Sequence, residues 1–214
     1  MMLLGIDTCG GLGTVALARS EGEAINLVGQ KEIAGKTYSA QLVPTIQQLL
    51  EEQSVRIKDL KAVIVVHGPG SFTGVRIGVS TAKALAEALN LPILAVSRLV
   101  VLAHKADADA AALDAGRGEF YFTDKSEEAL LLPDEVRGRV EGSLAVCEQN
   151  SAQIFPEAVV VDPPSAADAL AFAVPRLIAM DYDDLATIDG NYLRRSDAEI
   201  FAKRTGEPTS AGTE

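Results

Sequence analysis

The glycine-rich segment from residue 68 to residue 78 carries the densest group of residues that could bind a ligand. It reads Gly-Pro-Gly-Ser-Phe-Thr-Gly-Val-Arg-Ile-Gly and separates a run of β-branched residues from an amphipathic stretch, so we expect it to join a buried strand to a helix. Backbone N–H groups exposed at the start of a helix attract anions. The candidate anion-binding residues of this segment are Gly68, Gly70, Ser71, Thr73, Gly74 and Arg76.

The same segment also suits a tight strand-to-helix turn in which Ser71 or Thr73 caps the helix, and the residue types alone leave both interpretations open. It is not a P-loop, because it lacks the Gly-Lys-Ser/Thr ending of that motif. It is not the nucleophile elbow of a hydrolase, since Pro69 and Thr73 stand where that motif has glycine. The sequence therefore predicts no catalytic serine here.

A second candidate group lies at the end of the first predicted strand, where Asp7 and Thr8 precede a cluster of glycines. This arrangement resembles the first phosphate-binding hairpin of the actin-like ATPase fold, in which an aspartate holds a metal–phosphate complex through water. Asp114 has the equivalent place in the second half of the chain. The alternative is an aspartate that satisfies the backbone N–H groups of a turn. Because residues 162–165 lack the glycine pair that would hold an adenosine, the sequence does not predict nucleotide turnover.

Metal and thiol chemistry find no support in the spacing of histidine and cysteine. His67 and His104 are separated by predicted secondary structure, and no two histidines stand four residues apart. Cys9 and Cys147 are far apart and show no Cys-x-x-Cys spacing. We therefore expect no catalytic residue, no metal site and no disulfide, and we interpret both cysteines as small buried hydrophobic residues.

The elements that must position these groups follow from the hydrophobic periodicity of the first half. Strands are predicted at 2–7, 14–18, 25–33, 61–66 and 92–96, and helices at 39–53, 74–89 and 97–105. The first two strands form a hairpin around the glycine cluster. The strand, helix and strand between 61 and 96 form a parallel crossover unit.

The second half begins as the first does, with an apolar strand that ends in Asp, a glycine turn and a return strand. Further strands are predicted at 130–132, 144–147 and 158–161, and a helix at 166–180. We therefore predict an α/β protein with a duplicated fold whose second lobe is reduced. Residues 1–106 form the first lobe, residues 107–204 the second, smaller lobe, and residues 205–214 a disordered tail.

The predicted helix 74–89 has little polar surface for a helix that covers one face of a sheet. Its polar side chains fall mostly on one narrow stripe, and small residues repeat every four positions beside a bulky ridge. The helix 39–53 covers part of this flank but has an apolar face of its own. We therefore predict a four-helix bundle with two helices of another molecule. The predicted partner-binding residues are Leu42, Val43, Ile46, Leu49, Gly78, Ala82, Leu85, Ala86 and Leu89.

The composition narrows the class of protein. With 30 acidic and 19 basic side chains the net charge is -11, which disfavours direct binding of nucleic acid. The basic residues near the end, Arg194, Arg195, Lys203 and Arg204, form either a small basic patch or an ordinary solvated segment. A hydrophobic content of 48% supplies a packed core, and the apolar runs are far shorter than the roughly 20 residues that a membrane span needs. We expect a cytoplasmic protein without a membrane anchor or signal peptide.

Four segments in this order resemble the TsaB family, also called YeaZ, which takes part in making threonylcarbamoyl-adenosine on tRNA. They are Leu-Gly-Ile-Asp-Thr at 4–8, the glycine segment at 68–78, Leu-Asp-Ala-Gly-Arg-Gly-Glu at 113–119 and Tyr-Leu-Arg-Arg at 192–195. The resemblance covers about residues 2–204, and the glycine segment is its most specific part. One departure is Gly116, where the family usually has arginine.

The resemblance implies an actin-like ATPase fold (ASKHA, ribonuclease H-like) without catalysis of its own. It also implies a scaffold subunit that pairs with the catalytic sister TsaD through first-lobe helices, with the small ATPase TsaE docking on the pair. The chain would form a homodimer when alone and would meet tRNA only through the complex. No cofactor is expected, apart from a nucleotide that the partners could share at their interface, where Asp7, Thr8 and the glycine segment form a vestigial anion site. The competing interpretation is an enzyme, either an actin-like small-molecule kinase or ATPase or a peptidase-like protein.

Overall fold

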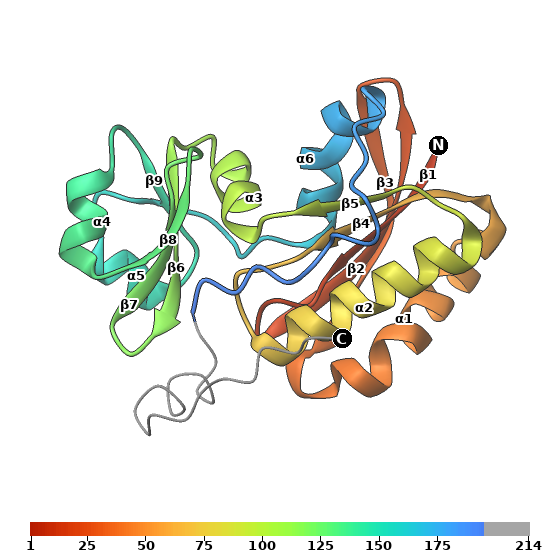
Figure 1. Ribbon diagram of the computed structural model, residues 1–214, viewed down its shortest axis with the longest axis horizontal. Coiled ribbons are helices and arrows are strands. Elements are labelled where there is room, and N and C mark those ends of the chain that lie inside the picture. The colour runs from red at the N-terminus through yellow and green to blue at the C-terminus, as the bar shows by residue number, and fades with distance from the viewer. Residues whose placement is uncertain (195–214) are drawn as a thin grey trace.

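The computed structural model describes residues 1–194, which form two five-stranded sheets with helices on both faces (Figure 1). The first half contains β1 (Met2–Asp7), β2 (Leu12–Glu21), β3 (Ala24–Ala34), α1 (Tyr38–Glu52), β4 (Leu60–Val66), α2 (Phe72–Leu89), β5 (Ile93–Val96) and α3 (Arg98–Lys105). The second half contains β6 (Ala110–Gly116), β7 (Glu119–Thr123), β8 (Glu128–Leu131), α4 (Pro133–Arg139), β9 (Leu144–Val146), α5 (Gln149–Ile154), β10 (Val159–Val160) and α6 (Ala166–Ile178).

The two sheets have the same topology. The strand order is β3-β2-β1-β4-β5 in the first sheet and β8-β7-β6-β9-β10 in the second. In each sheet the first strand of the half is antiparallel to the second and parallel to the fourth, and the fifth is parallel to the fourth. The predicted hairpin, crossover unit and duplication are therefore confirmed.

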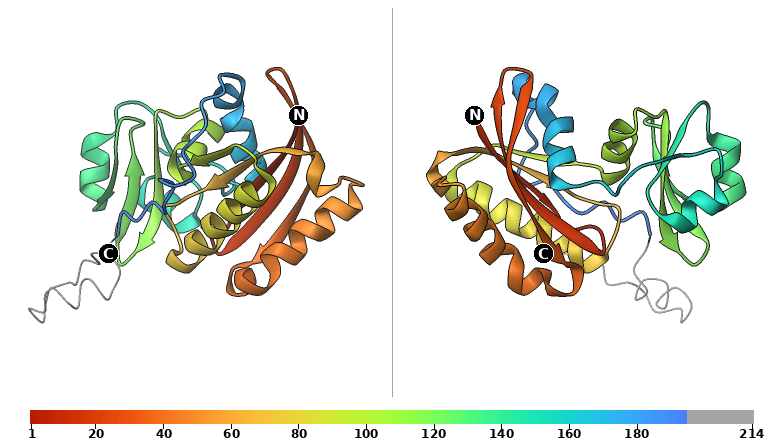
Figure 2. Two further views of the ribbon diagram at one scale, coloured as in Figure 1. Left: turned by 45° about the vertical axis from the view of Figure 1, so that its right-hand side comes forward. Right: turned by 180° about the vertical axis from the view of Figure 1, so that it is seen from behind.

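The helices are exchanged between the halves. Helix α3 follows β5 but packs against β6, β7 and β9 of the second sheet, whereas α6 follows β10 but packs against β1, β2 and β4 of the first. The two helices also contact each other. The right-hand view of Figure 2 shows α6 beside the first sheet and α3 beside the second, on the sides of the two sheets that face each other. The division into units 1–106 and 107–204 stays a prediction. Helix α3 belongs to the first range but completes the core of the second sheet, and α6 belongs to the second range but completes the core of the first sheet.

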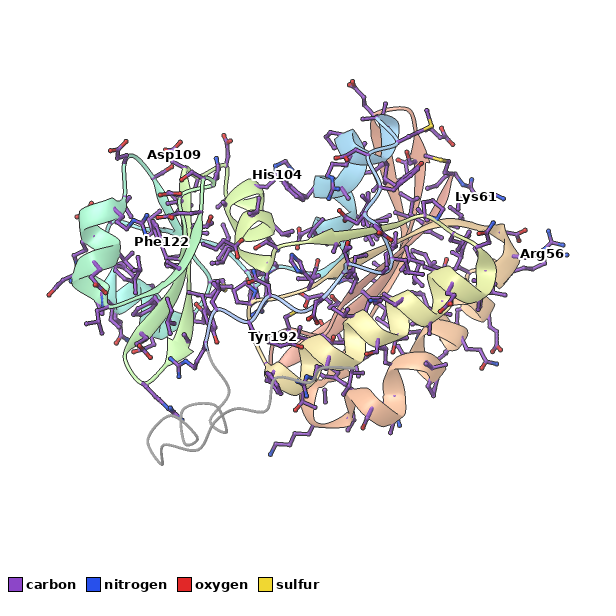
Figure 3. All side chains as sticks on the ribbon, viewed as in Figure 1. Arg56, Lys61, His104, Asp109, Phe122 and Tyr192 are labelled. Carbon is purple, nitrogen blue, oxygen red and sulfur yellow. The ribbon has the colours of Figure 1, made fainter. Side chains whose placement is uncertain are left out.

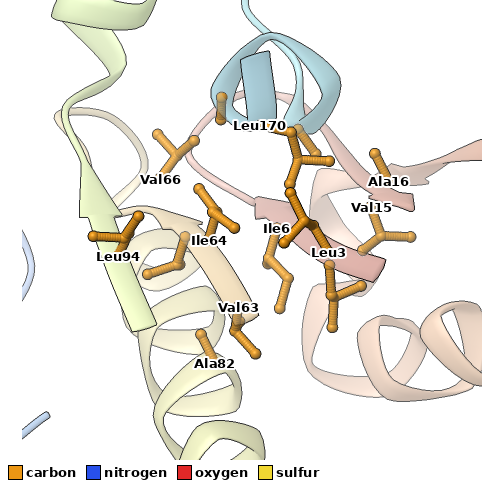
Figure 4. Close-up of a cluster of buried hydrophobic side chains, with 14 of the residues drawn as sticks. Leu3, Ile6, Val15, Ala16, Val63, Ile64, Val66, Ala82, Leu94 and Leu170 are labelled. Atoms are coloured by element: carbon orange, nitrogen blue, oxygen red, sulfur yellow. The ribbon is translucent and has the colours of Figure 1, made fainter. Parts of the chain in front are cut away.

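The core of the first lobe has a helix layer on each side of the sheet. Helices α1 and α2 cover one face and α6 covers the other. Figure 4 shows Ala82 of α2 and Leu170 of α6 on opposite sides of the strands that carry Ile6 and Ile64. All four side chains are fully buried. Because β1 and β4 are covered on both faces, they read as continuous apolar runs in the sequence.

The boundaries of most predicted elements are correct within about three residues, but two helices were missed. Helices α4 and α5 contain 7 and 6 residues, too few for a hydrophobic period to repeat. The expected disordered tail 205–214 lies outside the described residues. Within the described part, no helix has the length and apolar character that crossing a membrane requires.

Candidate functional site

The candidate anion site begins with the turn between β1 and β2. Asp7 is the last residue of β1, and its Oδ1 atom accepts a hydrogen bond of 2.8 Å from the backbone N–H of Cys9. The side chain is only 2% exposed. Burial raises the pKa of the Asp7 carboxyl above its ordinary value, although the nearby charge of Arg98 partly opposes this shift. Asp7 is therefore a buried turn aspartate.

The predicted glycine segment packs directly onto this turn. The backbone N–H of Ser71 donates to the carbonyl oxygen of Cys9 (2.7 Å), and the Thr8 hydroxyl donates to the carbonyl oxygen of Gly74 (2.7 Å). A Cβ atom at Gly70 would overlap the Cys9 carbonyl, and one at Gly74 would overlap that of Thr8. These two glycines are needed for the close approach of two backbone segments.

The start of α2 supports the capping interpretation of the segment. The Ser71 hydroxyl accepts a 3.3 Å hydrogen bond from the N–H of Gly74 and is the N-cap of the helix. Thr73 is exposed in the first turn. Gly68 has a φ of +115°, a backbone conformation that favours glycine. The structure thus brings Asp7 and Thr8 together with the glycine segment, as expected. Several backbone groups of the segment, however, make hydrogen bonds within the chain.

Arg98, which no motif of the sequence singled out, supplies the positive charge next to Asp7. Arg98 is the first residue of α3, and its Nε atom lies 3.9 Å from Oδ2 of Asp7. The predicted Arg76 instead stacks over the ring of Phe72, with 4.0 Å between the guanidinium carbon and the ring centroid. The same guanidinium carbon lies 5.9 Å from the ring centroid of Tyr192, which is labelled in Figure 3. The position of Arg98 in the sequence could have identified it as a site residue. It follows β5, which is parallel to β4, as β1 is, so the carboxyl ends of the three strands lie at the same end of the sheet.

A cleft of about 1350 Å³ lies between the two lobes, at the carboxyl ends of the first-lobe strands. Asp114 lines the cleft from the second lobe, and its Oδ1 atom accepts from the N–H of Gly116 at 2.6 Å, which repeats the turn of Asp7. Unlike Asp7, Asp114 is exposed. The residues from the first lobe and from α3 that line the cleft include Cys9, Gly10, Gly11, Gly70, Ser71 and Arg98, and those from the second lobe include Cys147, Glu148, Asp162 and Pro163.

The fold class implies a nucleotide with a divalent cation in such a cleft, and the residues here do not fit that group. A guanidinium already faces the Asp7 carboxylate, where the metal would be held. Within residues 1–194 no three His, Cys, Asp or Glu side chains come together in a way that could hold a metal ion. We therefore derive no step through a metal–nucleotide complex.

The cysteines and histidines are dispersed. Cys9 is buried and its thiol donates to the carbonyl of Val66 at 3.2 Å, whereas Cys147 is only partly buried. Burial raises the pKa of the Cys147 thiol to about 12, so it is not a reactive thiolate at neutral pH. His67 contacts the carbonyl oxygen of Asp189 through Nδ1 (3.2 Å), and His104 packs edge-on against Phe172.

The prediction of partner-binding residues on α1 and α2 needs a correction. The small residues Gly78, Ala82 and Ala86 are buried in the chain's own core. A Cβ at Gly78 would overlap the hydroxyl of Thr8, the residue after β1, and Figure 4 shows Ala82 directed toward the sheet. Leu42, Ile46 and Leu49 of α1 are also buried in the core, whereas Leu85 and Leu89 are partly buried. The small-residue stripe therefore lets α2 lie close to β1 and does not form an exposed groove.

What remains exposed on the two helices is a surface with few charges. Helices α1 and α2 lie side by side on one face of the molecule (Figure 1). Val43 is 58% exposed and Phe72 is 39% exposed. Helix α1 has no charged residue before Glu51. The other exposed residues of the two helices are Ser39, Ala40, Gln41, Pro44, Gln47, Gln48, Glu51, Glu52, Thr73, Arg76, Ser80, Ala84, Glu87 and Ala88.

The expected basic patch near the end of the chain is only partly described. Arg194 donates to the carboxylate of Glu119 at 2.6 Å and to the carbonyl of Gly116 at 3.0 Å. Arg195, Lys203 and Arg204 lie outside the described residues. Because Arg194 is engaged in an ion pair with the second lobe, it ties the final described segment to the β6–β7 hairpin.

Comparisons with known proteins agree with one another. The family model described as "TsaD: tRNA N6-adenosine threonylcarbamoyltransferase" matches residues 30–182. The Escherichia coli tRNA threonylcarbamoyladenosine biosynthesis protein TsaB is 32% identical over 158 residues, which cover 66% of this chain and 67% of that protein. The TsaB proteins of Haemophilus influenzae and Bacillus subtilis are 35% and 37% identical, and the chain spans about half of their length, 53% in each case.

A solved structure shows the same fold. YeaZ from Pseudomonas aeruginosa superposes with a TM-score of 0.74 and 27% identity, covering 90% of this chain and 99% of that one. The predicted fold class, a duplicated actin-like (ASKHA, ribonuclease H-like) fold with a reduced second lobe, is confirmed by this likeness and by the repeated strand order. By its family model and its Escherichia coli relative, the chain belongs to the TsaB/YeaZ family of proteins for tRNA threonylcarbamoyladenosine biosynthesis.

Proposed function

We propose that the chain is a non-catalytic scaffold subunit that acts in the cytoplasm. It pairs with TsaD, and TsaE joins the pair, to support transfer of a threonylcarbamoyl group to the tRNA adenosine next to the anticodon. When TsaD is absent, the same surface pairs with a second copy of the chain. The observation that carries this proposal is the charge-poor exposed surface of α1 and α2.

Charge depletion at that surface is unusual for this chain. Charged residues make up 23% of the sequence, yet the only exposed charges of α1 and α2 between Ser39 and Gln48 and between Phe72 and Ala88 are Arg76 and Glu87. The centre of a protein interface is depleted of Lys, Glu and Asp and enriched in aromatic residues. Phe72, Val43 and the small exposed residues Ala84 and Ala88 supply the apolar part of such a centre.

The arrangement at the cleft supports a role without catalysis. The Asp7 carboxylate faces Arg98, and both cysteine thiols have a raised pKa because they are buried. The kinase or ATPase interpretation needs a metal–nucleotide site at Asp7, which the Arg98 side chain disfavours. No feature of the described residues favours a peptidase.

The test compares two exposed alanines on helices that cover opposite faces of the first sheet. Ala84 lies on α2 and Ala171 lies on α6, and both are exposed. Ala84→Glu is expected to weaken association with TsaD and with a second copy at least about tenfold, since it places a charge in the interface centre. Ala171→Glu introduces the same charge and is expected to leave association unchanged. Light scattering and titration calorimetry measure both variants, and circular dichroism checks that they fold.

Activity is tested by reconstitution. Purified TsaD, TsaE and the enzyme that makes the threonylcarbamoyl adenylate are combined with tRNA, with and without this chain. Modification is expected to depend on the chain and to fall with Ala84→Glu but not with Ala171→Glu. Full modification without the chain, or magnesium-dependent ATP turnover by the chain alone, would refute the scaffold role.

A further inference from the structure

The segment that follows α6 runs along the first lobe and then reaches the second. We call its residues 181–194 the strap. The strap passes the edge strand β5 and the helix α2 before it meets the second sheet (Figure 1). Residues 181–194 contain no helix or strand, so the strap is held by individual backbone groups and side chains.

The first part of the strap is fixed to the first lobe. The N–H of Asp183 donates to the carbonyl oxygen of Ile93 (3.1 Å), and its carboxylate accepts from the N–H of Ala95 (2.8 Å). The Lys83 side chain of α2 donates to the carbonyl oxygen of Ile188 at 2.8 Å. Ile188 is buried in the core of the first lobe. This part of the strap is therefore bound to both β5 and α2.

The strap passes from one lobe to the other between Tyr192 and Leu193. The N–H of Asn191 donates to the carbonyl oxygen of His67, just after β4, at 2.7 Å. Tyr192 packs against the first core, and its ring centroid lies 5.0 Å from that of Phe72 on α2. Leu193 packs instead against the apolar cluster of α3, β6 and β9. Consecutive residues of the strap thus belong to different cores.

Two polar side chains of the strap bind the second lobe. The amide nitrogen of Asn191 donates to the carboxylate of Glu128 on β8. Arg194 donates to the carboxylate of Glu119 and to the carbonyl oxygen of Gly116, which lie in the β6–β7 hairpin. The Arg194 side chain is only 18% exposed, so salt screens this ion pair less than it screens a fully exposed one.

The strap is attached away from the two other connections between the lobes. Within residues 1–194 the chain enters the second lobe through α3, which packs on β6, β7 and β9, and leaves it after β10. Strand β10 is one edge of the second sheet, whereas the strap binds β7 and β8 at the other edge. Two connections allow rotation about the line that joins them, and a third attachment away from that line prevents it.

We propose that the strap locks the two lobes in one orientation, so that the described chain moves as a single rigid body. Relative motion is the ordinary behaviour of two units joined by short connections. Here the contacts of the strap oppose that motion and need no ligand in the cleft. Because Tyr192 lies on Phe72 at the start of α2, the strap also fixes the second lobe relative to that helix.

Single-molecule energy transfer between the lobes tests the lock. Dyes are attached through noncanonical amino acids at Lys58 and Glu157, which are exposed on the first and second lobes. The natural chain is expected to give one narrow distribution of transfer efficiency. In Asn191→Ala/Arg194→Gln the distribution is expected to widen at least about twofold, because both polar links to the second lobe are lost. Molecules are observed singly, so pairing of copies does not contribute.

The matched control removes equivalent contacts that lie within one lobe. Arg137 donates to the carboxylate of Asp134 and to the carbonyl oxygen of Ile154, and Asn150 donates to the carboxylate of Asp114. Asn150→Ala/Arg137→Gln is therefore expected to keep the narrow distribution. Circular dichroism checks that both double variants fold.

Two further measurements keep the test decisive if the strap variant does not fold. Arg194→Glu is expected to widen the distribution, and adding Glu119→Arg is expected to narrow it again, since the ion pair is re-formed with reversed charges. In the natural chain the N–H of Asn191 is expected to exchange with deuterium at least about 100-fold more slowly than an exposed amide, because the strap stays attached.

Four results would overturn the proposal. They are a broad or two-peaked distribution in the natural chain, a narrow one in Asn191→Ala/Arg194→Gln, equal widening in the control, and exchange of the Asn191 N–H as fast as that of an exposed amide. All of these measurements use the chain without TsaD. A failure of the lock is therefore distinguishable from a failure of the scaffold role.

Discussion

The two lobes start from the same turn and use it differently. In the first lobe Asp7 accepts from the N–H two residues ahead at 2.8 Å, and in the second Asp114 does so at 2.6 Å. Asp7 is covered by the glycine segment and faces Arg98, whereas Asp114 stays exposed at the cleft. The aspartate turn is thus a shared local structure, and the surrounding packing decides whether it becomes a buried ionic centre.

The helices explain this difference. Helix α2 has 18 residues and brings the glycine segment onto the Asp7 turn, while the corresponding helix α5 of the second lobe has only 6. A long helix whose small residues face the sheet closes the end of the strands. The short helix leaves the equivalent end open. The reduced second lobe therefore keeps the topology but not the buried centre.

The largest expected effect comes from neutralising the two aspartates. Asp7→Asn is expected to lower the free energy of unfolding by about 3 kcal/mol, because it leaves the buried Arg98 charge uncompensated. Asp114→Asn is expected to change it by less than about 0.5 kcal/mol, as for other exposed positions. Urea unfolding measures both. Equal losses for the two variants would contradict the contrast between the lobes.

The helical glycines give the next comparison. Gly74→Ala is expected to destabilise the chain by about 2 kcal/mol, since its Cβ would overlap the Thr8 carbonyl. Gly138 in α4 has nothing within 4 Å of its Cβ position, so Gly138→Ala is expected to stabilise by about 0.5 kcal/mol through helix propensity. Thermal unfolding of the two variants is the measurement. A neutral Gly74→Ala would mean that the close approach to Thr8 is not required.

The smallest effect is a difference in pH dependence. Burial raises the pKa of Asp7, so the folded state binds its proton more tightly than the unfolded state. Relative to Asp7→Asn, the natural chain should therefore lose stability as the pH rises from about 3.8 through the folded pKa of Asp7. In the second lobe, hydrogen bonds from the backbone and side chain of Ser143 lower the pKa of Asp109. Its contribution is present above the unfolded pKa and is lost as the pH falls.

Urea unfolding between about pH 3 and pH 6 distinguishes these two behaviours. The stability difference between the natural chain and Asp7→Asn should fall with rising pH, and that between the natural chain and Asp109→Asn should rise. Slopes of the same sign would show that Asp7 is not the proton-binding group of the first lobe.

The sequence predicted the order of the strands and long helices because their hydrophobic periods are local. The glycine segment identified the family, and its position between β4 and α2 was correct. The direction of the α2 stripe was wrong, because periodicity shows that one side of a helix is distinctive and not what that side faces. From the sequence alone, Ala82 could equally have faced a partner protein or the sheet of its own chain. The structure shows that it is buried in the chain's own core.

The sequence by itself determined the duplicated strand pattern, the hairpin aspartates and the family. Only the tertiary structure decided that α3 and α6 exchange sheets and that Arg98 reaches Asp7 across 91 residues of chain. The physical reason is that secondary structure follows from neighbouring residues. Which side chains meet in a core or a cleft depends instead on how whole elements pack against one another.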